Sequence, residues 1–410
     1  MATEKNIPEI RFKGFEGDWE ENRLGSFSKF RRGSFPQPYG NSEWYDGEGA
    51  MPFVQVVDVT DKLTLVENTK QKISQLAQPK SVFVEKGKVV VTLQGSIGRV
   101  AILQYDAYLD RTLLIFESYE KETDSNFWAY TIQQKFEIEK KMAPGGTIKT
   151  ITKEALSSFQ ILLPKLPEQT QIGTYFQNLD SLISLHQRKY DKLLTVKKAM
   201  LEKMFPKEGA YVPEIRFKGF DGKWVEKTLG FDIADIIGGG TPSTFEQAYW
   251  NGNIDWYSPT EIGDNVYANG SEKKITELGM RKCSARLLPA GKTILFTSRA
   301  GIGYMAILQR IGTTNQGFQS LVLKDNYNTY FIYSIGHLIK KYALKNASGS
   351  TFLEISGKVL GKMILLVPTF EEQTKIGTFF QNLDTLITQH QKELEKLKNL
   401  KKACLEKMFV

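Results

Sequence analysis

Apolar residues recur every seven positions in two long stretches of the chain, residues 168–205 and 372–409. A second apolar stripe follows the first by four residues in each stretch. The first stripe, with one histidine in each copy, consists of Ile172, Leu179, His186, Leu193 and Met200, and of Ile376, Leu383, His390, Leu397 and Cys404. This repeat is typical of coiled-coil helices. At about 1.5 Å per residue, each helix would be roughly 55–60 Å long. We expect the two to form an antiparallel coiled coil within the chain.

The two stretches are also copies of each other. Aligned with residue 168 on residue 372, they are identical at 25 of 38 positions. A second repeated segment, PEIRFKGF, occurs at 8–15 and 213–220, and a tryptophan follows at Trp19 and Trp224. We expect this segment to be a strap that docks on a surface present in both halves. The period greatly exceeds the 20–50 residues of solenoid repeats, so the sequence predicts a duplicated domain pair with a pseudo-two-fold axis.

Two variable regions lie between the repeats, and their short apolar runs predict strands. In the first region we expect strands at 53–59, 89–93, 99–103, 113–116 and 159–164, and a helix near 124–141. In the second we expect strands at 255–257, 292–297, 304–308, 320–323 and 363–368, and a helix near 327–345. Two landmarks align between the regions: GSIGRVAIL with AGIGYMAIL, and APGGT with ASGST. Thr369 three residues before Glu372 predicts a capping box at the second long helix.

These segments predict an α+β fold in which two globular α/β domains are separated by the two long helices. The expected segments are an N-terminal strap (1–19), a first globular domain (20–165), a central long helix (166–205), a linker with the repeated strap (206–224), a second globular domain (225–369) and a C-terminal long helix (370–410).

Composition narrows the class of protein. The hydrophobic fraction of 41% and the charged fraction of 24% are ordinary for a soluble globular protein. The sequence contains no run of 18 apolar residues, so we expect no membrane span, and it shows no apolar segment of a secretory signal. The only cysteines, Cys283 and Cys404, lie in different halves, which favours a reducing cytoplasm and argues against zinc. The net charge of +8 is a weak indication of a nucleic-acid partner.

Motifs of catalysis are missing from the sequence. The chain has no Pro-Pro pair, which the common amino-methyltransferase loop requires, and no proline that precedes an aspartate, as nuclease sites often have. A phosphate-binding loop is also missing, since Arg286 stands where its first glycine would be. We therefore predict a chain that is not an enzyme and has no metal site of its own.

His186 and His390 occupy the same heptad position near the centre of their helices. One interpretation is a polar pair that fixes the register of the seam. The other is a metal site or a pH-sensitive site. With one further histidine in the chain, His337, the sequence favours the first interpretation.

Polar and basic side chains gather at the turns that the two regions share. Arginine, lysine, serine and threonine at such turns are typical contacts to phosphates and base edges. The candidates for DNA binding are Lys29, Arg31, Arg32, Ser34, Gln94, Ser96, Arg99, Lys149, Thr241, Ser243, Thr297, Ser298, Arg299, Ser350 and Thr351. Each one alone is equally well explained as a solvated turn residue. As a set of matched turns with different side chains, they indicate recognition loops.

Two similar but divergent domains joined by long helices suit a bipartite target such as duplex DNA. A two-fold dimer reads two half-sites about one helical turn apart, and here one chain would imitate the dimer. Because the domains differ, we expect an asymmetric target whose spacer is set by the length of the helices.

The chain resembles the specificity subunit of type I restriction–modification enzymes. The likeness is carried by LPEQTQIGTYFQNLDSLI, FEEQTKIGTFFQNLDTLI, IGGGTPS and PEIRFKGFEGDW, and it extends over essentially the whole chain. At the place of GGGTPS in the second half, the first half has RRGSFP.

The resemblance implies a non-catalytic, cytoplasmic subunit that binds double-stranded DNA and two modification subunits. Those partners would use S-adenosylmethionine to methylate adenine N6. Restriction subunits, with ATP and Mg, would translocate and cut unmethylated DNA, and this chain would hold no cofactor. Two other hypotheses remain open: an enzyme with an unrecognised active site, and a coiled-coil adaptor that binds only proteins.

Overall fold

The computed structural model describes residues 6–142, 151, 153–263, 265–349 and 353–409. The chain divides into two compact units, Met1–Gln187 with Glu393–Val410, and Arg188–Lys392. Each unit contains one variable region, part of the central long helix and part of the C-terminal one. The compact units therefore cut across the segments that the sequence suggests, because both long helices contribute to both units.

The two long helices are α4 (Leu166–Lys203) and α9 (Phe370–Met408). In the first unit, Tyr175 Oη lies 3.4 Å from Cys404 Sγ, and Lys401 Nζ lies 2.6 Å from Asp180 Oδ1. Residue numbers thus rise along α4 as they fall along α9. In the second unit, Lys197 Nζ lies 2.5 Å from the carboxylate of Asp384, and the ring of Phe205, just after α4, stacks on that of Phe380. The expected antiparallel pairing is confirmed within each unit.

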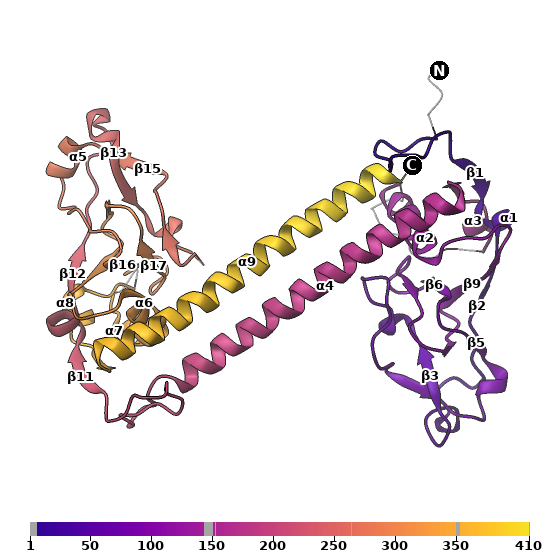
Figure 1. Ribbon diagram of the computed structural model, residues 1–410, viewed down its shortest axis with the longest axis horizontal. Helices are drawn as coiled ribbons and strands as arrows, with labels where there is room; N and C mark the ends of the chain where they lie inside the picture. The colour runs from indigo at the N-terminus through magenta and orange to yellow at the C-terminus, as the bar shows by residue number, and fades with distance from the viewer. Residues whose placement is uncertain (1–5, 143–150, 152, 264, 350–352, 410) are drawn as a thin grey trace. The chain divides into compact units, whose positions relative to one another are not determined.

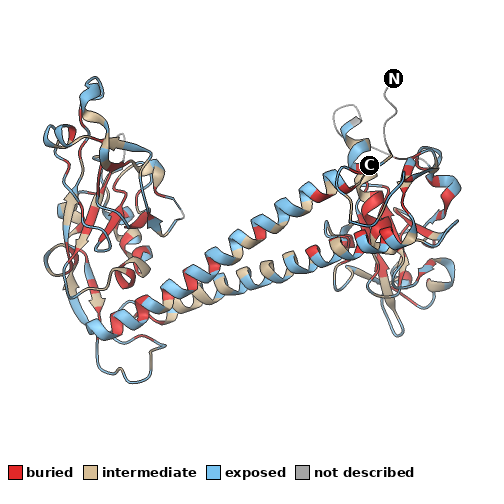
Figure 2. Ribbon diagram, turned by 45° about the horizontal axis from the view of Figure 1, so that its top comes forward, coloured by how far each residue is buried: buried red, intermediate tan, exposed pale blue. Residues whose placement is uncertain are grey.

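Burial along the seam is uneven. The buried residues of α4 lie in its first part, between Glu168 and Leu179, and most of those of α9 also lie in its first part (Figure 2). The fully buried members of the first stripe are Ile172, Leu179, Ile376, Leu383 and Cys404. The half-buried members are His186, Leu193, Met200, His390 and Leu397. Two helices packed on each other bury only a narrow stripe of each helix. A residue of the stripe is therefore fully buried only where a globular domain also packs against it.

Each strap docks where the start of one long helix meets the end of the other. In the first unit, Arg11 makes a bidentate bond to Glu168 of α4, with both N–O distances 2.7 Å. Phe12 packs edge-on against Tyr175, and the N–H of Ile10 donates to the carbonyl of Lys407 at 2.9 Å. The strap therefore ties α4 to α9 within this unit.

The second strap makes the same set of contacts. Arg216 bonds Glu372 of α9 through both of its oxygens at 2.7 Å. Phe217 packs edge-on against Phe379, and the N–H of Ile215 donates to the carbonyl of Lys203 at 2.9 Å. In both units the strap's tryptophan is buried. Trp19 contacts the rings of Phe127 and Phe409, and Trp224 contacts those of Phe331 and Phe205.

The first globular domain contains two four-stranded sheets and a two-stranded pair. Its strands are β1 (Glu20–Arg23), β2 (Ser28–Arg32), β3 (Met51–Val54), β4 (Gln71–Ile73), β5 (Val82–Val84), β6 (Val89–Thr92), β7 (Val100–Ile102), β8 (Ala107–Leu109), β9 (Leu113–Tyr119) and β10 (Gln160–Leu163). Its helices are α1 (Leu24–Phe27), α2 (Ser125–Met142) and α3 (Lys153–Ser157). The sheet orders are β2-β9-β6-β7 and β4-β3-β8-β5, and β1 pairs with β10.

The second globular domain has a five-stranded and a three-stranded sheet. Its strands are β11 (Val225–Thr228), β12 (Ala234–Gly238), β13 (Trp250–Tyr257), β14 (Tyr267–Ala268), β15 (Lys273–Ile275), β16 (Thr293–Phe296), β17 (Met305–Leu308), β18 (Gly312–Thr314), β19 (Gln319–Leu323) and β20 (Ile364–Val367). Its helices are α5 (Glu277–Arg281), α6 (Thr329–Ser334), α7 (Gly336–Asn346) and α8 (Gly357–Leu360). The orders are β12-β19-β16-β17-β14 and β15-β13-β18, and β11 pairs with β20.

The two domains share their topology. The order β2-β9-β6-β7 corresponds to β12-β19-β16-β17, and the parallel pair β3–β8 corresponds to the parallel pair β13–β18. In Figure 1, β13 and β15 lie together at the end of the second domain away from β11, and β3 lies at the end of the first domain away from β1. The duplication therefore includes the variable regions, although their sequences match only sparsely.

Several details differ from the sequence expectation. The strand expected at 53–59 ends at Val54, because the N–H of Gln55 bonds the side chain of Asp58 at 2.8 Å and starts a turn. The helix expected near 327–345 is broken between α6 and α7, where Gly336 packs directly beneath Met305. The short strands β1 and β11 were not expected, although they close each domain by pairing with its last strand.

The capping box expected at α9 is only half formed. The N–H of Glu372 donates to Thr369 Oγ1 at 3.4 Å. The carboxylate of Glu372, which should return to the backbone of Thr369, is instead held by Arg216. The ion pair with the strap takes the place of the second capping bond, because a guanidinium bonds both carboxylate oxygens at once.

Candidate nucleic-acid interface

The glycine run of the second domain lies between β12 and β13 and approaches other backbone closely. A Cβ at Gly239 would overlap the backbone carbonyls of Thr314 and Asn315, and one at Gly240 would lie 2.8 Å from Ser284 N. These two positions therefore require glycine. Gly238 is different, since a Cβ there would meet nothing nearer than 3.9 Å. The close approach fixes the path of the loop that carries Thr241 and Ser243.

Two tryptophans hold this loop from below. Trp256 Nε1 donates to the carbonyl of Gly240 at 2.8 Å, and Trp250 Nε1 donates to that of Ser243 at 3.0 Å. At the loop's exposed side, the hydroxyl of Thr241 donates to Gln316 Oε1. Thr241 and Ser243 are exposed, as their candidate role requires.

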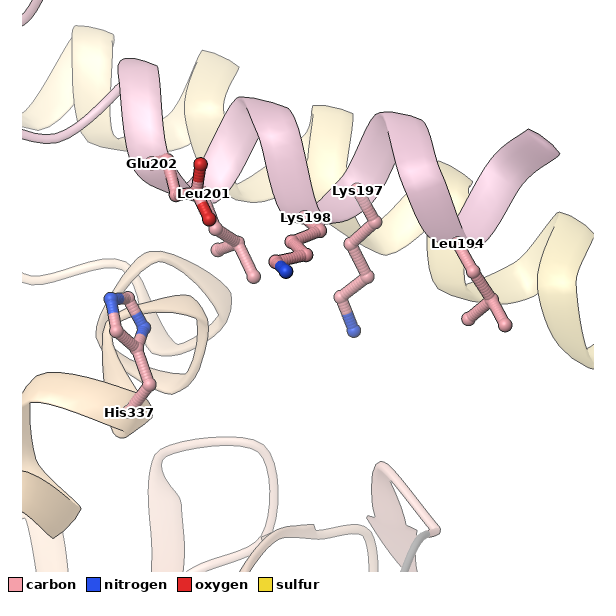
Figure 3. Close-up of a pocket in the computed structure, with 6 residues that line it drawn as sticks. All are labelled: Leu194, Lys197, Lys198, Leu201, Glu202 and His337. Atoms are coloured by element: carbon pink, nitrogen blue, oxygen red, sulfur yellow. The ribbon is translucent and has the colours of Figure 1, made fainter. Parts of the chain in front are cut away.

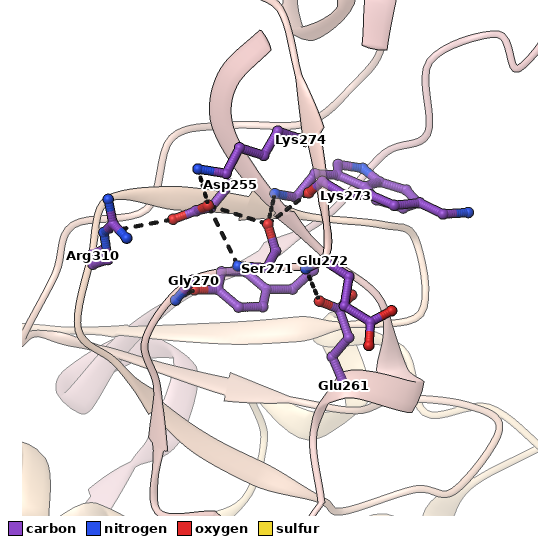
Figure 4. Close-up of polar contacts among 10 residues, drawn as sticks. Asp255, Glu261, Gly270, Ser271, Glu272, Lys273, Lys274 and Arg310 are labelled. Carbon is purple, nitrogen blue, oxygen red and sulfur yellow. Dashed lines mark hydrogen bonds and ion pairs between the residues drawn. The ribbon is translucent and has the colours of Figure 1, made fainter. Parts of the chain in front are cut away.

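The strand beneath the loop is fixed by a buried carboxylate, Asp255 (Figure 4). The backbone N–H of Ser271 donates to Asp255 Oδ1 at 3.4 Å, and its hydroxyl donates to the carbonyl of Lys273 at 2.6 Å. Lys274 Nζ lies 3.4 Å and Arg310 Nε 4.0 Å from the same carboxylate. A buried carboxylate requires such partners, so Asp255 orients the half-buried Lys274 and the exposed Arg310.

The first domain builds the equivalent loop from different residues. A Cβ at Gly33 would overlap the carbonyls of Leu109 and Asp110, which is the packing of Gly239. The N–H of Ser34 donates to Leu109 at 3.1 Å, as that of Gly240 donates to Thr314 at 2.9 Å. RRGSFP and GGGTPS thus follow the same path, with one shared close approach.

A tyrosine closes the loop of the first domain. Tyr39 Oη donates to Asp110 Oδ2 at 3.2 Å and accepts from Gln55 Nε2 at 3.0 Å. Burial and the charge of Asp110 raise the pKa of Tyr39, so the phenol stays protonated as a donor at neutral pH. Ser34 Oγ, half-buried, donates to the carbonyl of Lys80 at 3.2 Å.

The turns at GSIG and AGIG are held by an internal threonine. Thr297 Oγ1 donates to the carbonyl of Gly301 at 2.6 Å and accepts from the N–H of Tyr304 at 2.9 Å. Thr92 makes the corresponding bonds to Ser96 and Arg99. Thr297 and Ser298 have 0% exposure. Both were candidates for DNA binding, yet neither side chain is at the surface as such a contact would require, and Thr297 closes the turn instead.

The other candidates of these turns remain at the surface. Gln94 and Arg99 are exposed, and Ser96 and Arg299 are half-buried. Leu93 N bonds the carbonyl of Thr112 at 2.8 Å, and Ser298 N bonds that of Gly317 at 2.8 Å. Thr112 and Gly317 follow shortly after the residues whose backbone carbonyls Gly33 and Gly239 pack against. In both domains the structure therefore brings the GSIG or AGIG turn next to the loop that contains this glycine.

The remaining candidates are spread along β2 or fall outside the described residues. Lys29, Arg31 and Arg32 are exposed. Arg31 Nε lies 2.5 Å from Glu117, and Arg32 reaches the carbonyl of Ile151 at 3.5 Å. Lys149, Ser350 and Thr351 lie outside the residues that the structure describes.

The structure also adds two residues that the sequence reasoning missed, Arg111 and Gln316. Both side chains are exposed, and each belongs to a turn whose backbone carbonyls lie against Gly33 or Gly239. In the sequence, LDRTL aligns with TNQGF one residue out of step with the main repeat. The two strings share no residue type at these positions, so their equivalence is hard to see from the sequence.

A polar network joins each domain to both long helices. In the first unit the hydroxyl of Tyr130 bonds Asp180 of α4, which also pairs with Lys401 of α9. In the second, Tyr330 Oη lies 2.7 Å from Asp384 of α9, which pairs with Lys197 of α4. Burial, followed by the neighbouring aspartate, raises the pKa of both tyrosines.

Two segments of the chain, residues 16–195 and 221–399, match the family described as type I restriction modification DNA specificity domain. The chain belongs to this family. The two matches fall one on each half of the duplication. Each specificity domain thus includes a globular domain together with most of the long helix that follows it.

Named relatives agree with this assignment. The chain is 37% identical over 183 residues to the type I restriction enzyme MjaIX specificity subunit of Methanocaldococcus jannaschii, a match that covers 44% of this chain and 42% of that relative's length. It is 23% identical over 413 residues to the MjaVIII specificity subunit of the same organism, covering 97% of this chain and 94% of the relative.

A solved structure shares the fold of this specificity-domain chain. The S subunit of a type I restriction-modification system from M. genitalium has a TM-score of 0.58 at 18% identity, covering 98% of this chain and 99% of that one. At this identity the likeness concerns the fold alone, and it agrees with the expected α+β class and tandem organisation.

The described residues of this specificity-domain chain contain no group of three or more His, Cys, Asp or Glu side chains placed to hold a metal ion. No described helix has the length and apolar character needed to cross a bilayer. His186 belongs to the first unit and His390 to the second, so their meeting at the seam stays a prediction.

An open depression of about 300 Å³ lies in the second unit, between α4 and the start of α7 (Figure 3). Its walls are Leu194, Lys197, Lys198, Leu201, Glu202 and His337. Burial lowers the pKa of His337, so the imidazole is neutral near pH 7. The walls of this depression thus combine two leucines with charged side chains and this histidine.

Proposed function

We propose that this chain is the DNA-recognition subunit of a type I restriction–modification complex, and that each globular domain reads one half of an asymmetric, bipartite target. One observation carries the proposal: the two domains hold loops of the same backbone path, at Gly33 and Gly239, with different exposed side chains. A shared path with divergent side chains supports two readers of different sequence. Membership in the specificity family supports DNA as the ligand.

The long helices support a scaffold role for the same subunit. Five leucines of α4 and α9 are at least 38% exposed: Leu182, Leu185, Leu194, Leu386 and Leu400. Exposed apolar residues along a helix favour contact with another protein. The partners would be two modification subunits and the restriction subunits. Methyl transfer from S-adenosylmethionine to adenine N6, and ATP- and Mg-dependent cleavage, would belong to them.

The experiment is co-expression of the chain with its modification subunit, followed by single-molecule sequencing for methyladenine. We expect a split, asymmetric motif that disappears when the chain is omitted. Methylation that does not depend on the chain would contradict the proposal and favour a protein adaptor or another enzyme.

A domain exchange tests the assignment of one half-site to each domain. Replacing residues 20–157 with those of a relative should change one half of the motif and leave the other intact. If both halves change, the domains do not read independently. Binding should also weaken steeply as salt rises, because phosphate contacts release counterions.

A further inference from the structure

Arg111 and Gln316 occupy equivalent points of the two interfaces. Each is the middle residue of a turn closed by the side chain before it. The N–H of Thr112 donates to Asp110 Oδ1 at 2.9 Å, and that of Gly317 donates to Asn315 Oδ1 at 2.8 Å.

The same two turns receive the glycines of the loops, through the carbonyls of Asp110 and Asn315. The backbone at Arg111 and at Gln316 is therefore held in the same geometry. The two domains differ here only in the side chain that this backbone carries.

The amide of Gln316 is held in one orientation. Thr241 donates its hydroxyl to Oε1, which identifies the oxygen side of the amide. An amide oxygen has a second lone pair, and the NH₂ group has two donors. Oε1 can therefore accept a second bond while Nε2 donates, which presents an acceptor and a donor side by side at the surface.

The guanidinium of Arg111 is supported in a different way. Its carbon lies 5.5 Å from the centre of the Tyr39 ring. The tyrosine is itself fixed by Asp110 and Gln55. A cation over an aromatic face is attracted to it, so the ring limits the orientations of the guanidinium. Arg111 therefore presents only hydrogen-bond donors, at the position where Gln316 of the second domain presents one donor and one acceptor.

We propose that Arg111 and Gln316 are the matched base-reading residues of the two domains, with Arg111 recognising a guanine in one half-site and Gln316 an adenine in the other. In the major groove guanine presents two acceptors, N7 and O6, which suit the donor fork of arginine. Adenine presents the N7 acceptor and the N6 donor, which suit the amide of glutamine. The inference rests on the proposed DNA-recognition function and adds the bases and the residues that read them.

The test uses the chain in complex with its modification subunit and compares Arg111→Gln with the unaltered chain. We expect one guanine of the methylated motif to be replaced by adenine or to become unspecified. Discrimination against other bases at that position should fall by roughly 5- to 150-fold. The other half-site should be unchanged. Gln316→Arg should show the converse, with an adenine of the other half-site replaced by guanine or lost.

Two further variants separate base reading from charge and from folding. Arg111→Lys keeps the positive charge without the planar fork, so it should keep overall affinity and reduce, without abolishing, the discrimination for guanine. Arg23→Gln removes an exposed arginine from β1, which pairs with β10 just before α4, and should alter no base of the motif.

Two results would overturn the inference. If Arg111→Gln weakens binding to every sequence alike and lowers the salt slope by about one, the residue contacts a phosphate. If the motif and its strictness are unaltered in both variants, the two residues read no base. Failure of the proposed function is a separate result, since the unaltered complex would then give no motif that depends on the chain.

Discussion

Arg11 bonds Glu168 in the first unit as Arg216 bonds Glu372 in the second, and the tyrosine–aspartate–lysine networks repeat with the same atoms. The exposed loops behave differently. Where the backbone of both domains follows one path, the first has Arg111 over Tyr39 and the second has Gln316 bonded to Thr241. The contacts that join domain to helix have stayed alike after duplication, whereas the surface side chains have diverged.

The first prediction breaks the comparison at the strap. Glu372→Gln leaves the half-buried guanidinium of Arg216 without its charge partner, so the second unit should lose roughly 1.5–3 kcal/mol of unfolding free energy. Glu168→Gln should destabilise the first unit by a similar amount. Urea denaturation followed by tryptophan fluorescence measures both.

A matched control is Glu214→Gln. Its pairs with Lys203 and Lys207 are exposed, so stability should change little. A loss confined to one of the two strap variants would mean that the straps are not equivalent.

The second prediction concerns the shared loop path. Gly239→Ala forces a Cβ into the carbonyls of Thr314 and Asn315, and such overpacking costs about 1–3 kcal/mol. Recognition of the half-site read by the second domain should weaken, while the other half-site is kept. Gly238→Ala, with open space at its Cβ, should behave like the unaltered chain in the same methylation assay. Equal effects of the two alanines would contradict the close approach.

The third prediction tests whether the two tyrosine–aspartate–lysine networks stabilise their units in the same way. The pKa of Tyr130 and of Tyr330 is raised on folding, so the unfolded chain ionises first, near pH 10. Their contribution is complete below about pH 10 and is lost above it, by at most about 1.4 kcal/mol per pH unit for each tyrosine.

The double variant Tyr130→Phe/Tyr330→Phe should therefore lose stability less steeply between about pH 10 and 11. Thermal unfolding at each pH provides the measurement. Identical slopes for the variant and the unaltered chain would show that these phenols do not titrate with folding.

The smallest effect is expected at Arg31. Its guanidinium is paired with Glu117 at the surface, which offsets the charge it would offer to DNA. Arg31→Ala should reduce affinity slightly and alter no base of the motif, as a binding titration at two salt concentrations would show. A change of sequence preference would make Arg31 a base-reading residue instead.

Much of the scaffold follows from the sequence because it depends on periodicity. The heptads of α4 and α9 predicted two helices and their pairing, and the repeated PEIRFKGF predicted a docked strap. The strap's partner was not predictable, since Glu168 and Glu372 look like ordinary first-turn acids of a helix. Only the fold brings Arg11 and Arg216 to them across more than 150 residues of chain.

The interface was harder to predict, because composition does not reveal which way a turn residue points. Thr297 and Ser298 look like surface donors and are buried, while Arg111 looks like an ordinary residue after a strand and is exposed in the interface. Their places depend on the closeness of Gly33 and Gly239 to distant carbonyls. No local pattern in the sequence encodes that distance.

The first compact unit is made from two pieces of chain that are synthesised far apart in time. Phe409, from the end of α9, stacks on Phe127 and contacts the ring of Trp19. On the ribosome, all residues of the second unit are translated before Phe409. We therefore expect the second unit to complete its core before the first. Chaperones that shield apolar surface should then matter most for the part of the protein that emerges first.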